Sequence, residues 1–292
     1  MPNVADIRRR IKGVKSTGKI TRAMEMVSAA KVRRAVQSAT VLRPYAEEAL
    51  SVLRQVRLAF PGNKHPLLET REVNHRIILL VSGNRGLAGT FYAQLFRKLR
   101  AYFADLSGEI MFVTVGKKSD AQAKRMGKDV LASFPDVLAM PTAESVRPIA
   151  KLLLDEYRSG RTDRIEIAYT NFFSMLRQEP VIRTLLPISS EEAESELEIS
   201  GRKPEEGKYA IEPGPDAVLE TMVPRLLEVE IYHAILESNA SQEAARMMAM
   251  RSATDAAKEM AEGLTLAYNQ LRQSKITQEI AELSAGKAAL EN

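Results

Sequence analysis

The chain has 292 residues, of which 45% are hydrophobic and only 5% aromatic, and it contains neither tryptophan nor cysteine. This hydrophobic fraction excludes wholesale disorder, and the lack of cysteine excludes disulfides, thiolate metal sites and thiol-based regulation. No apolar run reaches the length needed to cross a bilayer. The Arg-rich start has the composition of an organelle transit peptide, but its helical pattern continues beyond any plausible cleavage point, so we expect a cytosolic protein.

The net charge of +5 is distributed unevenly along the chain. Residues 1–34 carry ten Lys or Arg against only Asp6 and Glu25, a local charge of +8, so the remaining residues together carry −3. A helix this basic suits nucleic acid, anionic lipid or an acidic protein surface, or it is simply a solvated face. Charge alone leaves these four readings open.

Residues 3–58 read as one very long helix, with Pro44 inside it and Pro61-Gly62 after it. At the α-helical rise this segment spans roughly 80 Å. Its apolar stripe starts at Ile7, Ile11 and Val14 with coiled-coil spacing, and then apolar residues point in nearly every direction. Interleaved basic residues would be costly to bury in a core, so we expect this helix to be enclosed by partner chains.

The middle of the chain alternates between strand and helix signals. Alternation of this kind predicts an α/β domain with a Rossmann-like open, mostly parallel sheet, and the last two strands form an antiparallel edge pair joined through residues 171–180. The expected strands are residues 75–82, 109–115, 129–134, 164–170 and 181–188, and the expected helices are residues 87–103, 118–127 and 143–158.

A glycine-rich turn after the first strand is the one candidate for a phosphate site. Gly83, Gly86 and Gly89 are spaced at three-residue intervals, which does not match the dinucleotide fingerprint. Gly116-Lys117 lacks the upstream glycine of a phosphate loop, and the three histidines, His65, His75 and His233, have no metal-ligand spacing. We therefore expect no catalytic, cofactor-binding or metal-binding residue, and interpret the turn as strand-to-helix packing.

A second very long helix is predicted from residue 216 to about residue 283, after an acidic, flexible connection over residues 191–215. It would span roughly 100 Å. Its apolar positions keep a 3–4 spacing that includes Ala257, Ala261, Leu264, Tyr268 and Leu271, and an alanine patch over residues 244–257 predicts a tight helix crossing. The expected partner is the N-terminal helix of the same chain, running antiparallel, so the division is 1–60, 74–190, 191–215 and 216–292.

Several motifs resemble the gamma chain of F-type ATP synthases. They are IRRRIKGV at residues 7–14, KITRAMEMV at 19–27, EAARM at 243–247, MRSATD at 250–255 and ITQEIAE at 276–282. The chain departs from the family pattern at Gly286-Lys287 and at the turn over residues 86–91. The resemblance covers the whole length, and the terminal motifs are highly specific.

The resemblance implies a non-catalytic rotor, present as a single copy, at the cytoplasmic face of the bacterial cell membrane as a peripheral subunit. In such proteins the terminal helices form an antiparallel coiled coil inside a ring of alpha and beta subunits, and the middle domain meets the epsilon subunit and the c-subunit ring. An acidic lever loop of the beta subunits would account for the +8 helix. The lack of cysteine and of a long regulatory insertion argues for a bacterial rather than a plastid chain.

The resemblance also assigns contact residues. Met24 matches the position that faces the beta lever, and Arg272 with Gln273 matches the pair that hydrogen-bonds a beta catch loop. Thr277 and Glu279 match neighbouring interface positions, and the last two assignments, to the foot that meets the c ring, are Tyr209 and Glu212.

Two rival functions remain at the level of sequence. An α/β nucleotide-binding enzyme with helical arms would need a ligand at the glycine-rich turn. A basic coiled-coil nucleic-acid binder would need aromatic or motif-based recognition, which residues 1–40 lack. We therefore expect no nucleic-acid partner.

Overall fold

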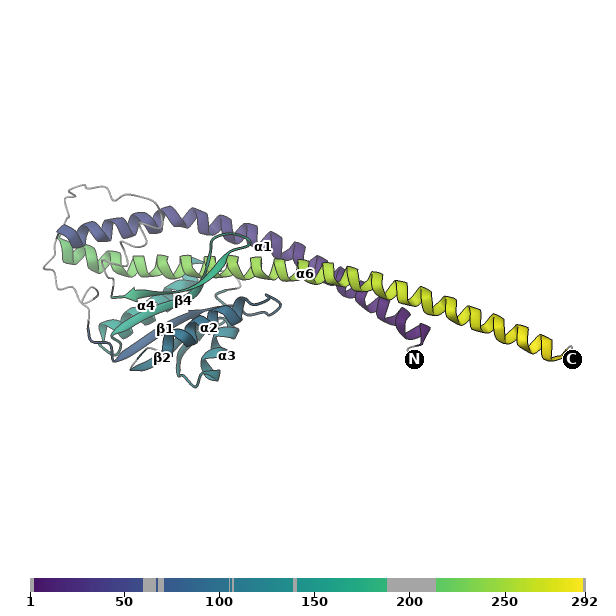
Figure 1. Cartoon of the computed structure of the whole chain (residues 1–292). Coiled ribbons are helices and arrows are strands. Elements are labelled where there is room, and N and C mark those ends of the chain that lie inside the picture. The colour runs from purple at the N-terminus through teal and green to yellow at the C-terminus, as the bar shows by residue number, and fades with distance from the viewer. Residues whose placement is uncertain are drawn as a thin grey trace. The chain divides into compact units, whose positions relative to one another are not determined.

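The computed structural model describes residues 3–59, 67, 71–104, 106, 108–138, 141–187 and 214–290. The chain forms two compact units (Figure 1), one made of residues 1–28 with 246–292 and the other of residues 29–245. We call them the terminal unit and the α/β unit. Each unit takes part of the two longest helices, α1 (Val4–Ala59) and α6 (Pro215–Leu290), which run through Pro44 and Pro224 respectively.

The α/β unit contains a five-stranded sheet with the strand order β3-β2-β1-β4-β5. The first four strands pair in parallel, and β4 pairs with β5 antiparallel. This arrangement confirms the expected mostly parallel sheet with an antiparallel edge pair. The strands are β1 (His75–Val81), β2 (Glu109–Val115), β3 (Val130–Phe134), β4 (Arg164–Phe172) and β5 (Gln178–Leu186).

Both faces of the sheet are covered by helices, which explains why the central strands read as continuous apolar runs. Alternate residues of β1 point to opposite sides, so Ile77 and Leu79 join one buried cluster, whereas Ile78 and Leu80 join the other. The first cluster includes residues of α4 (Ala143–Arg158) and α6, and the second includes residues of α2 (Phe91–Ala104) and α3 (Lys117–Arg125). The unit is therefore a three-layer α/β sandwich.

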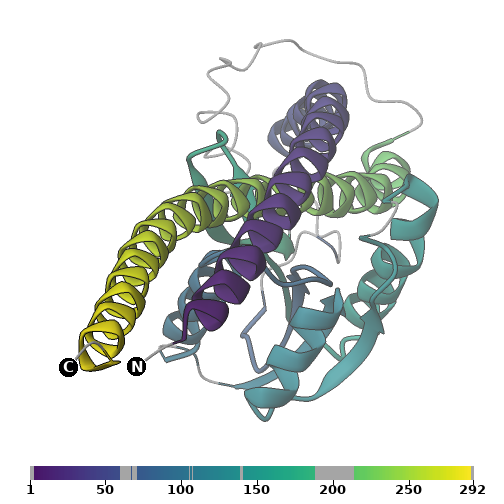
Figure 2. The same cartoon turned by 90° about the vertical axis from the view of Figure 1, so that its right-hand side faces the viewer.

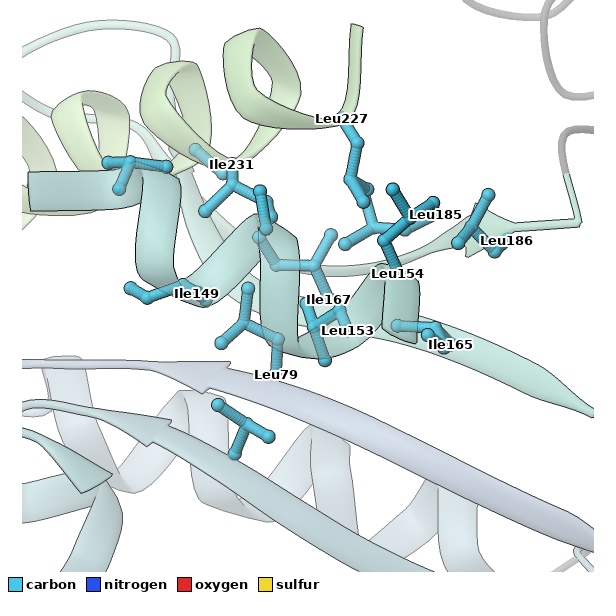
Figure 3. Packing of buried hydrophobic residues seen from close by; sticks show 14 of the residues in the cluster. Leu79, Ile149, Leu153, Leu154, Ile165, Ile167, Leu185, Leu186, Leu227 and Ile231 are labelled. Atoms are coloured by element: carbon cyan, nitrogen blue, oxygen red, sulfur yellow. The ribbon is translucent and has the colours of Figure 1, made fainter. Parts of the chain in front are cut away.

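Figure 3 shows how α6 enters this core. Leu227 and Ile231 of α6 lie with Leu154 of α4 and Leu185 of β5 in one apolar cluster. Ile231 is fully buried, and burying a side chain of this size contributes about 1.5–3 kcal/mol. The first part of α6 is thus a core helix of the α/β unit.

Several predicted boundaries differ from the structure, such as the end of the last helix at Leu290 instead of about residue 283, and two of the differences have a clear cause. The helix expected from Leu87 begins at Phe91, because Leu87 and Gly89 have left-handed backbone (φ 62° and 56°) that cannot continue a helix. The hairpin loop between the last two strands is shorter than residues 171–180, since pairing extends to Phe172 opposite Gln178. Pro180 lies within β5 itself, and an edge strand tolerates a residue that lacks the N–H donor.

A buried charge network lies at the amino-terminal end of the strands. The Glu166 carboxylate, 1% exposed, accepts hydrogen bonds from Arg76 at 2.6 Å and from the Tyr102 hydroxyl at 2.5 Å. The Arg164 guanidinium is 2.9 Å from the same carboxylate and donates to Thr184 at 2.6 Å. Burial, together with the bond to Glu166, raises the pKa of Tyr102 to about 12.

We predict that Tyr102→Phe flattens the loss of stability at alkaline pH. The folded chain keeps the Tyr102 proton up to about pH 12, whereas the unfolded chain loses it near 10.0, the ordinary pKa of a tyrosine hydroxyl. The contribution of the protonated Tyr102 hydroxyl to the free energy of unfolding is therefore complete below pH 10. It is lost as the pH rises from 10 to 12. Urea unfolding at a series of pH values measures it. Between pH 10 and 12 the free energy of unfolding should fall more steeply for the wild type than for Tyr102→Phe. Equal slopes for the two proteins would show that Tyr102 does not have a raised pKa.

Candidate interaction surfaces

The terminal unit consists of two antiparallel helical segments, the start of α1 and the end of α6. Gly18 and Ala257 face each other closely, since a β-carbon placed on Gly18 would lie 3.4 Å from that of Ala257. One turn further along α1, the hydroxyls of Thr21 and Thr254 are hydrogen-bonded at 2.8 Å. The two segments cross in both views (Figures 1 and 2), which confirms the expected antiparallel pairing.

The predicted apolar stripes are the positions that this pairing covers. Ile7 is buried and Ile11 and Val14 are half-buried on α1. On α6 the less exposed positions of the described segment include all five predicted stripe residues, Ala257, Ala261, Leu264, Tyr268 and Leu271. The predicted seam is therefore confirmed.

Apolar side chains also lie outside this seam. Ile20, Met26 and Val27 are each more than half exposed, and Met24 is half-buried. Met26 borders a groove of 1080 Å³ between α1 and α6, which Ala261 and Leu266 also line. Exposed apolar side chains on several sides of one helix indicate a surface that another protein covers.

A second groove of the terminal unit is strongly cationic. It has a volume of 1100 Å³ and includes Asn3 and Tyr268. Its basic lining residues are Arg8, Arg9, Lys12, Lys15, Lys19 and Lys275. Among the residues that the structure describes, only Lys275 of these six has a carboxylate within 4 Å, that of Glu279 at 3.9 Å. Such a groove attracts anionic groups.

The last part of α6 is not packed against any other described part of the chain. Residues 272–287 are all exposed, and among them are the predicted contact residues Arg272, Gln273, Thr277 and Glu279. The Thr277 hydroxyl donates to the Gln273 carbonyl at 3.0 Å, and the other three side chains project from the helix into solvent. The structure thus brings these four residues together on one exposed helical segment. Met24 lies on α1, and the predicted foot residues Tyr209 and Glu212 lie outside the described residues.

The glycine-rich turn after β1 is filled by the protein's own contacts. The Asn84 side chain accepts the Lys117 N–H at 2.8 Å and donates to the Pro135 carbonyl at 2.7 Å. The Gly83 carbonyl accepts the Lys118 N–H at 3.0 Å. These two N–H groups begin α3, and a helix N-terminus is where a phosphate would bind. Their bonds to the turn support the interpretation as packing.

Tyr92 and Gln242 close the same turn from other directions. A β-carbon on Gly83 would overlap the Tyr92 hydroxyl and the Gln242 side chain of α6, so the turn also packs against this helix. Within the described residues, no group of three or more His, Cys, Asp or Glu side chains could hold a metal ion. His233 lies 3.6 Å from Glu237 on α6, and His75 lies 3.6 Å from Asp163, whereas His65 is outside the described residues.

The sequence interpretation missed the buried charge network and the polar crossing of the terminal unit. The network had a signal, because Arg76 and Glu166 are charges of opposite sign in otherwise apolar strands. For the crossing, the alanine patch over residues 244–257 predicted a tight contact on α6, but the facing residues Gly18 and Thr21 had no signal because they interrupt the apolar pattern of α1.

A long antiparallel helix pair and an open α/β sheet also occur together in solved rotor structures of ATP synthases. The structure resembles the mitochondrial ATP synthase rotor of Euglena gracilis in rotational state 1, with a TM-score of 0.64 and 20% identity over 94% of this chain and 98% of that one. It also resembles a chain of the Euglena gracilis mitochondrial ATP synthase OSCP/F1/c-ring structure in rotational state 3. The TM-score is 0.66, and the identity is 18% over 98% of this chain and 94% of that one.

Sequence comparison gives the same family. The family model described as ATP synthase matches residues 3–290. The ATP synthase gamma chain of Heliobacterium modesticaldum is 41% identical over 99% of this chain and 100% of its own length. The ATP synthase gamma chain of Moorella thermoacetica is 38% identical over 99% of this chain and 100% of its own length. The chain belongs to the ATP synthase gamma chain family.

We predict that Gly116→Ala destabilises the isolated chain, whereas Gly86→Ala does not. Gly116 has φ 99°, and a β-carbon there would lie 2.7 Å from Leu138 and 3.0 Å from the Ser82 carbonyl. Strain and overpacking together cost about 2–4 kcal/mol. A β-carbon on Gly86 meets nothing within 4 Å. Urea unfolding measures both variants, and equal stabilities would show that the turn is not packed in this way.

Proposed function

We propose that this chain is the rotating central stalk of an F-type ATP synthase. It couples ion flow through the c-subunit ring to ATP synthesis and hydrolysis in a ring of alpha and beta subunits. The observation that carries this proposal is the exposed end of α6, where Ile276, Ile280 and Leu283 form an apolar stripe on a helix with no partner among the described residues. An isolated helical stripe of this kind needs a surrounding surface.

The surface of the terminal unit fits the inside of such a ring. Met24 and the neighbouring exposed apolar residues would lie against the ring, and the cationic groove would face its acidic loops. Arg272 and Gln273 would bind one loop of a beta subunit, with Thr277 and Glu279 beside it. Tyr209 and Glu212 would contact the c ring, and the α/β unit would also bind the epsilon subunit. The roles of the four α6 residues rest on the resemblance and on their exposure, whereas those of Met24, Tyr209 and Glu212 rest on the resemblance alone.

The chain itself holds no catalytic site in this proposal. A shaft changes a distant site only by the difference in contact free energy between that site's states. Changing nucleotide affinity a hundredfold needs a difference of about 2.7 kcal/mol, which a few asymmetric contacts supply. The filled turn over residues 82–90 argues against the rival nucleotide-binding enzyme.

The location follows from the partners. A stalk that binds the c ring is peripheral to the membrane, on its cytoplasmic face in a bacterium. Among the residues that the structure describes, no helix is both long and apolar enough to span a bilayer.

We predict that Arg272→Ala or Gln273→Ala lowers ATP-driven ion pumping and ion-driven synthesis by the assembled complex. Each substitution removes a polar contact worth about 1–3 kcal/mol when its partner is left unpaired, so a reduction of about tenfold is expected. The side chains are exposed in the isolated chain, whose melting temperature should not change. Ser274→Ala, on the same exposed turn, is the control. Wild-type rates in both variants would refute the assigned role.

We also predict that the isolated chain neither binds nor hydrolyses ATP. Isothermal titration calorimetry of the purified chain with Mg-ATP should give no saturable heat, while a mixture with alpha and beta subunits co-purifies as a complex. Stoichiometric, tight binding to the chain alone would instead support the enzyme.

A further inference from the structure

The hairpin between β4 and β5 ends in a group of exposed apolar side chains. Phe173, Met175 and Leu176 are 46%, 36% and 81% exposed, within four residues of one another. We call residues 173–177 the hairpin tip. Leu176 is among the most exposed large hydrophobic side chains in the described part of the molecule. An apolar group of this size at a loop tip favours contact with another protein over contact with water.

The hairpin tip is held in one conformation by its own hydrogen bonds. The Ser174 hydroxyl accepts the Arg177 N–H at 3.0 Å, and Phe173 N–H donates to the Arg177 carbonyl at 3.2 Å. The Gln178 side-chain amide donates to the carbonyls of Ser174 and Met175 at 3.0 and 2.7 Å. A loop ordered in this way loses little conformational entropy when a partner binds.

The charge at the hairpin tip is already neutralised. The Arg177 guanidinium lies over the Phe173 ring, 4.8 Å from its centroid, and donates to the Glu179 carboxylate at 2.7 Å. The tip therefore differs from the cationic groove of the terminal unit, because it offers an apolar surface rather than an unpaired charge. Its partner should be apolar rather than acidic.

The hairpin runs along the part of α6 that belongs to the α/β unit. Near the start of β4, Ile165 shares a cluster with Leu227 of α6. Near its end, the Thr170 carbonyl accepts a hydrogen bond from Ser241, fourteen residues further along α6, at 3.1 Å. The strand and the helix thus run in the same direction, and the hairpin tip extends beyond this contact (Figure 1).

We propose that the hairpin tip is a contact with an apolar patch on the alpha/beta ring, on the face through which the terminal helices enter. This proposal rests on the proposed rotor function, which directs the later part of α6 into that ring. As the whole chain turns, the hairpin tip would contact the subunits of the ring one after another.

Site-directed photo-crosslinking tests this contact, and a chain without natural cysteine makes it straightforward. The Leu176→Cys chain is labelled with benzophenone maleimide and assembled into the complete ATP synthase. Illumination should give a product with alpha or beta. Glu109→Cys is the control, since Glu109 is exposed at the amino-terminal end of β2. Products only with epsilon or c, or no more alpha or beta product than the control gives, would overturn the contact.

An affinity measurement separates this contact from the rotor function. Met175→Ser with Leu176→Ser should weaken binding of the chain to the alpha/beta ring about tenfold or more, as expected for losing one or two buried apolar side chains. Leu131→Ser, at an exposed position on β3, should not change the affinity for the ring. Equal binding by the double variant and the wild type would contradict the hairpin contact alone. A wild-type chain that does not bind the ring at all would contradict the rotor function as well.

Discussion

The structure depends on one helix, α6, meeting two different surroundings along its length. Around Leu227 and Ile231 it is part of a hydrophobic core, and from Arg272 onward every described side chain is exposed. A helix propagates by local hydrogen bonds, so a firmly packed segment supports the continuation of the same helix into solvent. The buried part of α6 thus anchors this helix in the core of the α/β unit. This is the mechanical requirement of a shaft, which must be anchored at one end and accessible to its partner at the other.

The α/β unit has a fold that often binds nucleotides, and here one face of its sheet packs against α6. Its carboxyl-terminal strand edge, where such folds place their ligands, is occupied by the turn around Asn84 and by Gln242 of α6. The N–H groups at the start of α3 bond to this turn instead of to a phosphate. Of the residues around this turn, Gln242 belongs to α6, so the turn also packs against that helix. Fold likeness alone would have pointed to an enzyme, whereas the local hydrogen bonds indicate a structural role.

Much of the fold could be predicted because its signals are local and repeated. The sheet strands are apolar runs bounded by turns, and the helix from Ala143 to Arg158 has both of its predicted ends. The start of α2 could not be predicted, since a helical pattern at Leu87 is overridden by left-handed backbone at Leu87 and Gly89. In the terminal unit the predicted apolar stripe of α1 ends at Val14, before the positions where Gly18 and Thr21 contact α6. Gly18 and Thr21 pack there because they are small, and a search for hydrophobic periodicity does not detect small residues.

The contact residues could not be predicted from amino-acid composition or from hydrophobic periodicity. Arg272, Gln273, Thr277 and Glu279 look like any exposed helical positions, and only resemblance to a family selected them. In the structure their helical segment is exposed, as a segment that binds another protein must be. Exposure does not distinguish one exposed turn from the next, because the determining partner atoms belong to other chains.

The proposed rotation of this chain is tested most directly by a single-molecule rotation measurement. A bead attached through Arg125→Cys, on the exposed end of α3, reports the motion of the α/β unit while the alpha/beta ring is fixed to a surface. On addition of ATP the bead should rotate continuously in one direction in complexes that hydrolyse ATP. A stationary bead on actively hydrolysing complexes would show that this chain is not their rotor.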